Sequence, residues 1–440
     1  MTEQPPNQIQ QRTIYPLKRL CDVGVALYDC DHRTPKPTKF GYPYIAIPQI
    51  QQGRLDLSDV RRISKDDYES WIQRNKPQTG DIIVTRRARV GDTAVIPPGL
   101  ECAIGQNLVI LRSDGTQVDQ SFLRWALRGP FYEREMSKFL NVGAIFDSLN
   151  CGDIPKFELP IPPLPVQRQI ANILGCLEEK IVVCHRMNET FEATARTIFQ
   201  SWFVNFDPVL AKADGRQPEG MDSATATLFP SDIEEIEDRK IPKGWSMGTL
   251  ERIADNIRRP VNPEQIDPDT PYIGLEHMPQ HSIALDQWGS ASTVESGKFE
   301  FRKNEFLFGK LRPYFHKVGI APVDGICSTD ILVISPKKDS WASFVICYIS
   351  SNEFVEFSNQ GSDGTKMPRS NWSAMKRYPI IIPPEDTVIK FNSMLIPVFE
   401  RINANIHEAH TLTQIRDSLL PKLMSGDIAL NGTENFTEVK

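Results

Sequence analysis

The sequence lacks the features that would place it in a membrane or outside the cell. Its 440 residues contain no apolar run near the roughly 18–20 residues that span a bilayer. Residues 1–20 hold no apolar run either, so they do not predict a secretory signal. The eight cysteines form no CxxC pair, and Cys176 and Cys184 fall within a predicted helix, which favours reduced thiols over disulfides. We therefore expect a cytoplasmic protein without a membrane partner.

Motifs of metal sites and of common enzymes are also missing. The seven histidines show no metal-binding spacing, since Pro279 separates His277 from His281. There is no GxxxxGK[ST] phosphate loop. The stretch FDPV (206–209) lacks the second proline and the aromatic residue of an amino-methyltransferase motif, and EEK (178–180) has no upstream aspartate to complete a nuclease motif. We expect no catalytic residue, metal or cofactor in this chain.

Charge limits how the chain could bind nucleic acid. The formal net charge is −6, whereas nucleic-acid-binding domains are usually basic. No predicted domain is strongly basic. Any binding to nucleic acid must therefore use local patches, or rely on a partner to neutralise phosphates.

A long helical pattern follows a proline cluster in the first half. The prolines end at Pro165 and the next is Pro208, so a helix can run between them. Apolar residues recur there in steps of four and three, which predicts a coiled-coil seam on a helix of roughly 38 residues. The seam consists of Ile170, Leu174, Leu177, Ile181, Cys184, Asn188, Phe191, Ala195, Ile198 and Trp202.

The second half repeats the first. PYIGL (271–275) echoes PYIAI (43–47), and YPIIIPPEDTVIKF (378–391) echoes FELPIPPLPVQRQI (157–170). The repeat projects a second seam, in which Arg416 is the one clear break and Pro397 predicts a kink. That seam consists of Phe391, Leu395, Val398, Ile402, Asn405, Ala409, Leu412, Arg416, Leu419 and Leu423. A seam needs a facing helix, so we predict that the two helices pair, with Asn188 and Asn405 helping to set the register.

We therefore predict an α+β fold with two duplicated α+β domains joined by an antiparallel intramolecular coiled coil. β-Rich runs such as DIIVT (81–85) and NLVILRS (107–113) supply strands, and SKDDYESWIQRN (64–75) supplies a helix with a Ser N-cap. The predicted boundaries are domain 1 at 1–160, helix 1 at 161–206, an extended connector at 207–245, domain 2 at 246–384, helix 2 at 385–425 and a tail at 426–440.

Several motifs resemble the specificity (S) subunits of Type I restriction–modification systems. They are PIPPLPVQRQIANILGCLEEKI (160–181), FQSWFVNFDPV (199–209), GRQPEGMDSATATLFP (215–230), IPKGW (241–245) and LLPKLMSGDI (419–428). The second junction departs from the family, because PPEDTVIKF replaces its usual Pro-Leu-x-x-Gln pattern. The resemblance covers nearly the whole chain.

The resemblance implies a DNA-reading subunit without catalysis of its own. Each α+β domain would be a target recognition domain that reads half of a bipartite, asymmetric site in double-stranded DNA, with the helices as spacer. The implied partners are two modification (methyltransferase) subunits and the restriction (motor-nuclease) subunits. S-adenosylmethionine, ATP and Mg²⁺ are expected on those partners and not on this chain.

Candidate DNA-binding residues fall in two places in each half. Arginines after a strand can contact guanine or grip phosphate; the alternative is a solvated turn paired with Asp81 and Asp92. The loop before each proline junction is the second place. The candidates are Arg86, Arg87, Arg89, Ser148 and Asn150 in the first half, and Lys310, Arg312, Tyr314, Lys366, Arg369 and Asn371 in the second.

Two other classes of function compete with this interpretation. An autonomous enzyme is disfavoured by the missing motifs. A duplicated coiled-coil scaffold that binds only protein is disfavoured by the paired basic turns. Methylation of DNA by the complex with its methyltransferase partner distinguishes the three.

Overall fold

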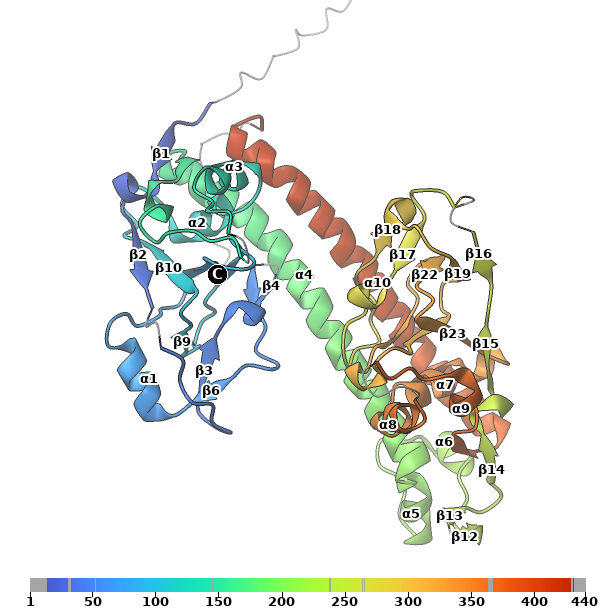
Figure 1. The fold of residues 1–440 in the computed structure, drawn as a ribbon. Coiled ribbons are helices and arrows are strands. Elements are labelled where there is room, and N and C mark those ends of the chain that lie inside the picture. Colours follow the sequence, from blue (N-terminus) through green and yellow to red (C-terminus); the bar gives the residue numbers. More distant parts are fainter. Residues whose placement is uncertain are drawn as a thin grey trace, which may run out of the picture. The chain divides into compact units, whose positions relative to one another are not determined.

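The computed structural model describes residues 14–30, 33–51, 53–143, 146–236, 239–262, 264, 266–362, 367–428 and 430. The chain divides into two compact units (Figure 1). Unit 1 comprises Met1–Glu179 and Leu412–Lys440, and unit 2 comprises Lys180–Thr411. Each unit therefore holds one predicted α+β domain together with part of both long helices.

Unit 1 is built on an antiparallel sheet in the order β2-β10-β7-β8. The strand β7 is wholly buried, as its unbroken apolar sequence predicts. A second sheet has the order β6-β3-β9, and β1 pairs with β11. The strands are β1 (Leu17–Arg19), β2 (Val25–Asp29), β3 (Tyr42–Ile45), β4 (Ile50–Gln51), β5 (Arg54–Leu55), β6 (Arg62–Ile63), β7 (Ile82–Thr85), β8 (Thr93–Val95), β9 (Ala103–Ile104), β10 (Leu108–Ser113) and β11 (Glu158–Pro160).

The first of the short α-helices of unit 1 begins where the sequence predicts. The short helices are α1 (Lys65–Ile72), α2 (Gln120–Ala126) and α3 (Pro130–Lys138). Ser64 caps α1 by accepting a hydrogen bond from the Asp67 amide at 3.1 Å. The break between α2 and α3 falls at Gly129, whose φ of 76° suits glycine, and the following proline starts α3.

Unit 2 repeats this architecture. Its sheet β15-β23-β20-β21 is antiparallel like its counterpart, and the parallel pair β17–β22 matches β3–β9. The strands are β14 (Ser246–Thr249), β15 (Ala254–Ile257), β16 (Pro260–Val261), β17 (Pro271–Ile273), β18 (Gly289–Ser290), β19 (Lys298–Phe301), β20 (Phe306–Gly309), β21 (Val318–Ile320), β22 (Gly325–Cys327), β23 (Ile331–Pro336) and β24 (Pro379–Ile382). The helices are α7 (Ala342–Ile349), α8 (Asn352–Gln360) and α9 (Trp372–Met375).

The segment 207–245 is more ordered than the extended connector that we predicted. It forms α5 (Asp207–Ala213), α6 (Ser223–Thr227) and a hairpin of β12 (Ile233–Ile236) and β13 (Arg239–Pro242). The reason is burial, because Val209, Phe229 and Ile241 enter the main hydrophobic core of unit 2.

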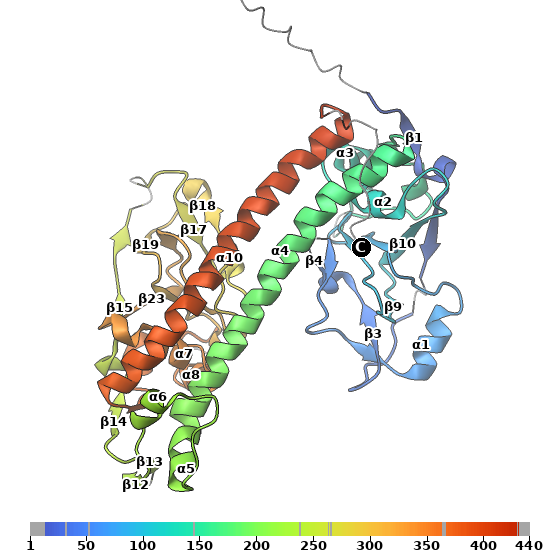
Figure 2. The same ribbon diagram turned by 180° about the vertical axis from the view of Figure 1, so that it is seen from behind.

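The long helices are α4 (Leu164–Phe199) and α10 (Glu385–Ser425). In unit 1 the start of α4 packs against the end of α10, where Ile170 and Leu174 share a core with Leu420. In unit 2 the later part of α4 meets the first part of α10, with the rings of Phe199 and Phe391 centred 6.2 Å apart. Residue numbers rise along one helix as they fall along the other, so the pair is antiparallel, as predicted (Figure 2).

The observed seam is shifted from the predicted one at three positions of α4. Leu177, Phe191 and Ile198 are only half-buried, and the residue after each of them is buried instead. The cause is that each domain covers the helix from the side, so the buried stripe is wider than a two-helix contact requires. On α10, Phe391, Leu395 and Ile402 are buried as predicted, whereas Val398, Leu412 and Leu419 are half-buried. Helical structure continues through Pro397.

Candidate nucleic-acid interface

The three arginines after β7 have different roles in unit 1. The Arg86 guanidinium donates to the carbonyl of Gln106 at 3.2 Å and to that of Leu149 at 3.5 Å. The Arg89 guanidinium donates to the carbonyls of Ile50, at 2.6 Å, and Ile47, and it also pairs with Asp92 at 3.3 Å. Arg87 is exposed, and no described residue pairs with its side chain.

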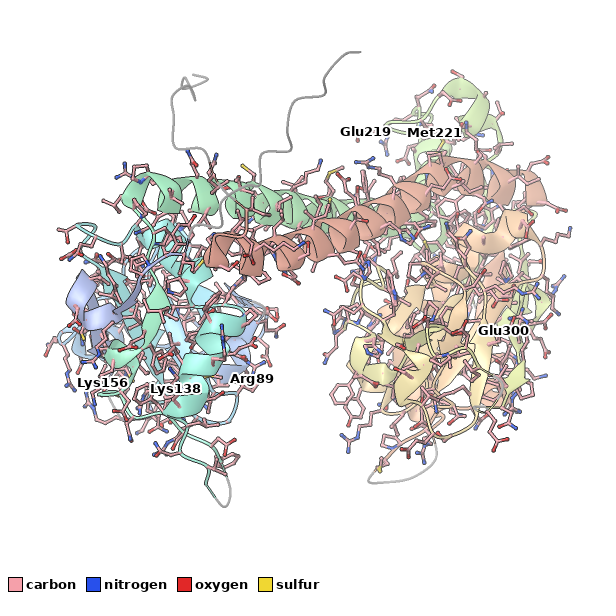
Figure 3. All side chains as sticks on the ribbon, turned by 90° about the horizontal axis from the view of Figure 1, so that it is seen from above. Arg89, Lys138, Lys156, Glu219, Met221 and Glu300 are labelled. Carbon is pink, nitrogen blue, oxygen red and sulfur yellow. The ribbon has the colours of Figure 1, made fainter. Side chains whose placement is uncertain are left out.

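The turn holding these arginines, residues 85–91, is here called recognition turn 1. Its geometry is fixed locally, because the Gly91 amide donates to the Thr85 carbonyl at 3.0 Å and Ala88 has a φ of 61°. The alternative of a turn paired with aspartates is correct for Asp92 and wrong for Asp81, which instead pairs with Arg112 at 2.6 Å. Figure 3 shows Arg89 in the domain of unit 1 and not on a long helix.

Unit 1 brings its two predicted DNA-binding places together. The Leu149 amide donates to the Arg86 carbonyl at 2.9 Å, and Arg87 forms a β-bridge with Ser148. Ser148 is half-buried in this bridge. The exposed Asn150 side chain donates to Asp153 at 3.2 Å. Recognition turn 1 and the loop before the proline junction therefore form one surface, which the sequence alone could not show.

Unit 2 repeats this pairing. Recognition turn 2, residues 309–317, contacts the loop before the second proline junction through a β-bridge between Leu311 and Arg369. The Arg312 amide donates to the Pro368 carbonyl at 2.8 Å, and the Ser370 amide donates to the Lys310 carbonyl at 2.9 Å. The same two segments therefore meet in both halves.

The predicted DNA-binding side chains of unit 2 differ in their exposure and in their hydrogen-bond partners. Tyr314 is 51% exposed, and Lys310 is half-buried with no described partner for its ammonium group. Arg369 donates to Asp330 at 3.3 Å. Asn371 instead caps α9 by accepting from the Ala374 amide at 2.9 Å. Arg312 is half-buried, with a buried Nε that has no partner, and Lys366 lies outside the described residues.

A basic hollow, which the sequence did not predict, lies beside recognition turn 1. It has a volume of about 730 Å³. Its lining includes Lys39, Arg61, Arg62, Gln106 and Asn107. These residues lie far apart in the chain, and the sheet β6-β3-β9 gathers them. The one local signal was the Arg61–Arg62 pair.

The hollow is continuous with recognition turn 1. The Arg86 amide donates to the Asn107 carbonyl at 2.8 Å, and Ile47, which accepts from Arg89, also lines the hollow. Arg61 and Gln106 are exposed, and no described residue pairs with their side chains. Guanidinium and amide groups are the ones that bind guanine and adenine edges in the major groove. The surface therefore has the chemistry of a DNA-reading site.

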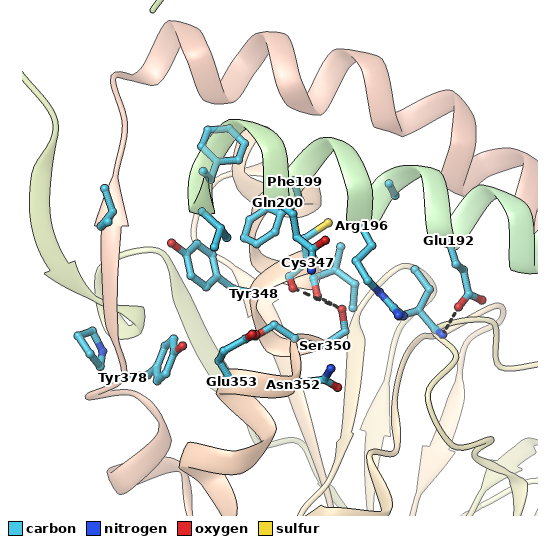
Figure 4. A pocket seen from close by; sticks show the side chains of 18 of the residues that line it. Glu192, Arg196, Phe199, Gln200, Cys347, Tyr348, Ser350, Asn352, Glu353 and Tyr378 are labelled. Atoms are coloured by element: carbon cyan, nitrogen blue, oxygen red, sulfur yellow. Dashed lines mark hydrogen bonds between the residues drawn. The ribbon is translucent and has the colours of Figure 1, made fainter. Parts of the chain in front are cut away.

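Unit 2 contains a cavity of about 270 Å³ between α4 and α7 (Figure 4). Phe199, Tyr348 and Tyr378 are among its lining residues. Burial raises the pKa of the lining thiol, Cys347, to about 12, so this thiol stays protonated and is a poor nucleophile. Cys347 therefore does not supply the cavity with an activated nucleophile.

Two other kinds of feature are absent from the described residues. No helix among them is long and apolar enough to cross a bilayer. Nor do three or more of their His, Cys, Asp and Glu side chains gather where a metal ion could be held.

Comparison with known proteins identifies the family. Residues 19–190 and 242–408 each match the Type I restriction modification DNA specificity domain. The Type I restriction enzyme HindI specificity subunit of Haemophilus influenzae is 25% identical over 329 residues, which cover 64% of this chain and 72% of that protein. The Type I restriction enzyme MjaIX specificity subunit of Methanocaldococcus jannaschii is 25% identical over 363 residues, which cover 79% of this chain and 78% of that protein.

A solved structure shares the fold. The crystal structure of the Type I restriction–modification S subunit from M. genitalium superimposes with a TM-score of 0.56 at 14% identity, over 95% of this chain and 98% of that one. This likeness concerns the fold, whereas the family follows from the two matches to the specificity domain. The chain therefore belongs to the Type I restriction–modification DNA specificity family, whose subunits recognise DNA sequence and are not themselves the catalyst.

Proposed function

We propose that this chain reads a bipartite, asymmetric site in double-stranded DNA, one half-site for each recognition domain. The observation that carries the proposal is the repeated meeting of a recognition turn with the loop before a proline junction, at Arg87–Ser148 and at Leu311–Arg369. The two copies present different donors, arginine-rich in unit 1 and containing Lys310 and Tyr314 in unit 2. Different donors select different base edges, so the half-sites should differ in sequence.

Within unit 1 we propose separate roles for the basic residues. Arg61, Arg87 and Gln106 have exposed side chains without described partners, so they can contact base edges or phosphates. Arg86 and Arg89 bind carbonyls within the domain, so they hold the surface in shape. The net charge of −6 implies that much of the phosphate neutralisation comes from a partner.

The paired helices support a role in assembly. Apolar side chains on α4 and α10 remain at least a third exposed, including Ile173, Val183, Ile389, Ile396 and Ile415. Exposed apolar groups along one element favour a protein partner. We propose that two modification subunits dock there, that restriction subunits join them, and that these partners carry S-adenosylmethionine, ATP and Mg²⁺. The helices would then also fix the gap between half-sites, because a coiled coil holds a distance that a flexible linker cannot.

The test is methylation by the reconstituted complex of this chain with its cognate modification subunits. Mapping of methyl-adenine should reveal one split motif. Changing Arg61 or Arg87 to Glu should lower methylation by about fivefold to a hundredfold, the range expected for one lost base contact. Lys65→Glu is the matched control, since Lys65 is exposed on α1 and pairs only with Glu69 among described acidic groups.

The alternative is a scaffold that binds protein and has no DNA specificity. It predicts a complex that assembles and methylates nothing in a sequence-dependent way. That result would contradict the proposal. Unchanged methylation by both arginine variants would instead remove this surface from the DNA interface.

A further inference from the structure

Two glutamates of α4 are buried inside the protein. Glu178 in unit 1 is 3% exposed, and Glu192 in unit 2 is 7% exposed. A carboxylate is costly to bury unless strong donors surround it. Both residues lie in the buried stripe of α4 but neither is apolar, so apolar packing alone does not explain why α4 directs them inwards.

Glu178 joins three elements of unit 1. Arg54, from β5, donates from Nε to its carboxylate at 2.9 Å and from its terminal nitrogen to its main-chain carbonyl at 3.2 Å. Arg416 of α10 also donates to the carboxylate. Arg124 of α2 lies 3.9 Å away. One carboxylate thus connects the recognition domain to both long helices.

Glu192 makes a comparable connection in unit 2, with different donors. The Ser282 hydroxyl donates to it at 2.8 Å, and the amides of Ile283 and Ala284 donate at 3.1 Å each. Figure 4 shows Glu192 reaching from α4 with a dashed line to this turn. Three donors on one turn fix both the distance and the direction of the contact.

The turns that meet these glutamates are equivalent in the two halves. We call them anchor turns, residues 53–55 and 281–284. The first, in which Arg54 and Leu55 form β5, comes after β3, a short 3-10 helix and β4. The second comes after β17 and a short 3-10 helix. Each has a residue of positive φ, 84° at Gly53 and 57° at His281. The duplicated domains therefore use the same turn to contact the same helix, 14 residues or two heptads apart along α4.

Each anchor turn is also connected to the recognition turn of its unit. In unit 1 Arg89 donates to the carbonyl of Ile50, three residues before Gly53. In unit 2 the His281 amide donates to the His316 carbonyl at 3.0 Å, within recognition turn 2. Each anchor turn therefore lies close to a hydrogen bond with the recognition turn of its unit, at Ile50–Arg89 and at His281–His316.

We propose that Glu178 and Glu192 are positioning residues that set the orientation of each recognition domain on α4, and so the angle at which each recognition turn meets its half-site. The proposal rests on the proposed function. DNA turns by about 34° with each base pair, since roughly 10.5 pairs make one turn. A domain held firmly at one angle discriminates between gaps that differ by one base pair, whereas a loosely held domain tolerates several.

The experiment measures methylation of DNA in which both half-sites are kept and the gap is varied by one and two base pairs. In the reconstituted complex, Glu192→Gln places an amide against at least one donor of the anchor turn. The preference for the native gap should then fall by about fivefold to tenfold, as expected for loss of one such hydrogen bond. Base preference within each half-site should not change. Glu189→Gln, an exposed change on the same helix, is the control.

A second variant guards against misfolding. Ser282→Ala removes one of the three donors to Glu192 and should shift gap preference in the same direction by less. Equal loss of methylation at every gap would show a purely structural role and overturn the proposal, as would unchanged gap preference in both variants. A wild-type complex that methylates no split motif would overturn the proposed function itself, before any variant is compared.

Discussion

The polar pair inside the helix seam of unit 2 permits a quantitative prediction. Asn405 donates from Nδ2 to Oδ1 of Asn188 at 2.8 Å, and both side chains are buried. The second polar atom of Asn405, Oδ1, is buried without a partner. We predict opposite effects from changing one asparagine and from changing both to leucine, which has nearly the shape of asparagine.

The magnitude follows from the cost of an unpaired buried group. Asn188→Leu leaves Asn405 with its Nδ2 unpaired as well as its Oδ1, which costs about 1–3 kcal/mol. Changing both residues to leucine removes the polar side-chain atoms of this pair and adds buried apolar surface. Such a paired replacement is about neutral or stabilising. The two changes should therefore not be additive, because the residues are in direct contact.

Hydrogen exchange of α4 amides in the intact chain is a suitable assay. It reports the free energy of local opening, which a global unfolding curve of a two-unit chain does not isolate. The single variant should exchange about 5- to 150-fold faster over residues 181–199, and the double variant should recover wild-type protection. If the double variant exchanges as fast as the single one, the asparagine pair does not act as a unit and the reasoning is wrong.

Four further outcomes are expected. Arg86→Ala should lower the thermal midpoint because its guanidinium holds two carbonyls, whereas Arg87→Ala should leave the midpoint unchanged and weaken DNA binding by the complex. Arg61→Ala should lower the affinity of the complex for DNA without making that affinity more dependent on salt. Titration at two salt concentrations measures both. Burial acts to raise the pKa of Glu178, but Arg54 and Arg416, with Arg124 nearby, outweigh it and hold that pKa below its ordinary 4.5. The stabilisation that the Glu178 carboxylate gives the fold is therefore present above about pH 4.5 and is lost as pH falls through the lower folded-state pKa. The difference in thermal midpoint between wild type and Glu178→Gln should therefore shrink in acid. Pro397→Ala should slow exchange of α10, since it restores a main-chain donor within a helix.

The architecture could be predicted because it depends on local sequence patterns. Proline clusters mark where α4 and α10 begin, and apolar steps of four and three mark the helices between. Ser64 and Gly129–Pro130 mark helix boundaries through capping and backbone preference alone. Because the second half repeats the first, each element predicted in the first half also predicts its counterpart in the second.

The local patterns were less informative where several elements pack together. Segment 207–245 was predicted to be a connector because it is acidic, interrupted by prolines and without a sustained period, yet Phe229 and Ile241 are buried in unit 2. The predicted seam residues Leu177 and Phe191 are half-buried, because periodicity assumes one facing helix and the domain supplies a second contact.

By itself, the sequence determined the duplication, the helix pair and the family to which the chain belongs, since these depend on spacing and on motifs. Only the tertiary structure decided which basic residues remain available to DNA. Arg86, Arg87 and Arg89 look alike in sequence, but their roles depend on carbonyls supplied by Ile50 and Leu149, far away in the chain. The buried state of Glu178 likewise depends on donors from β5 and α10. Hydrogen-bond geometry is set by how segments distant in sequence meet, and no local pattern encodes that meeting.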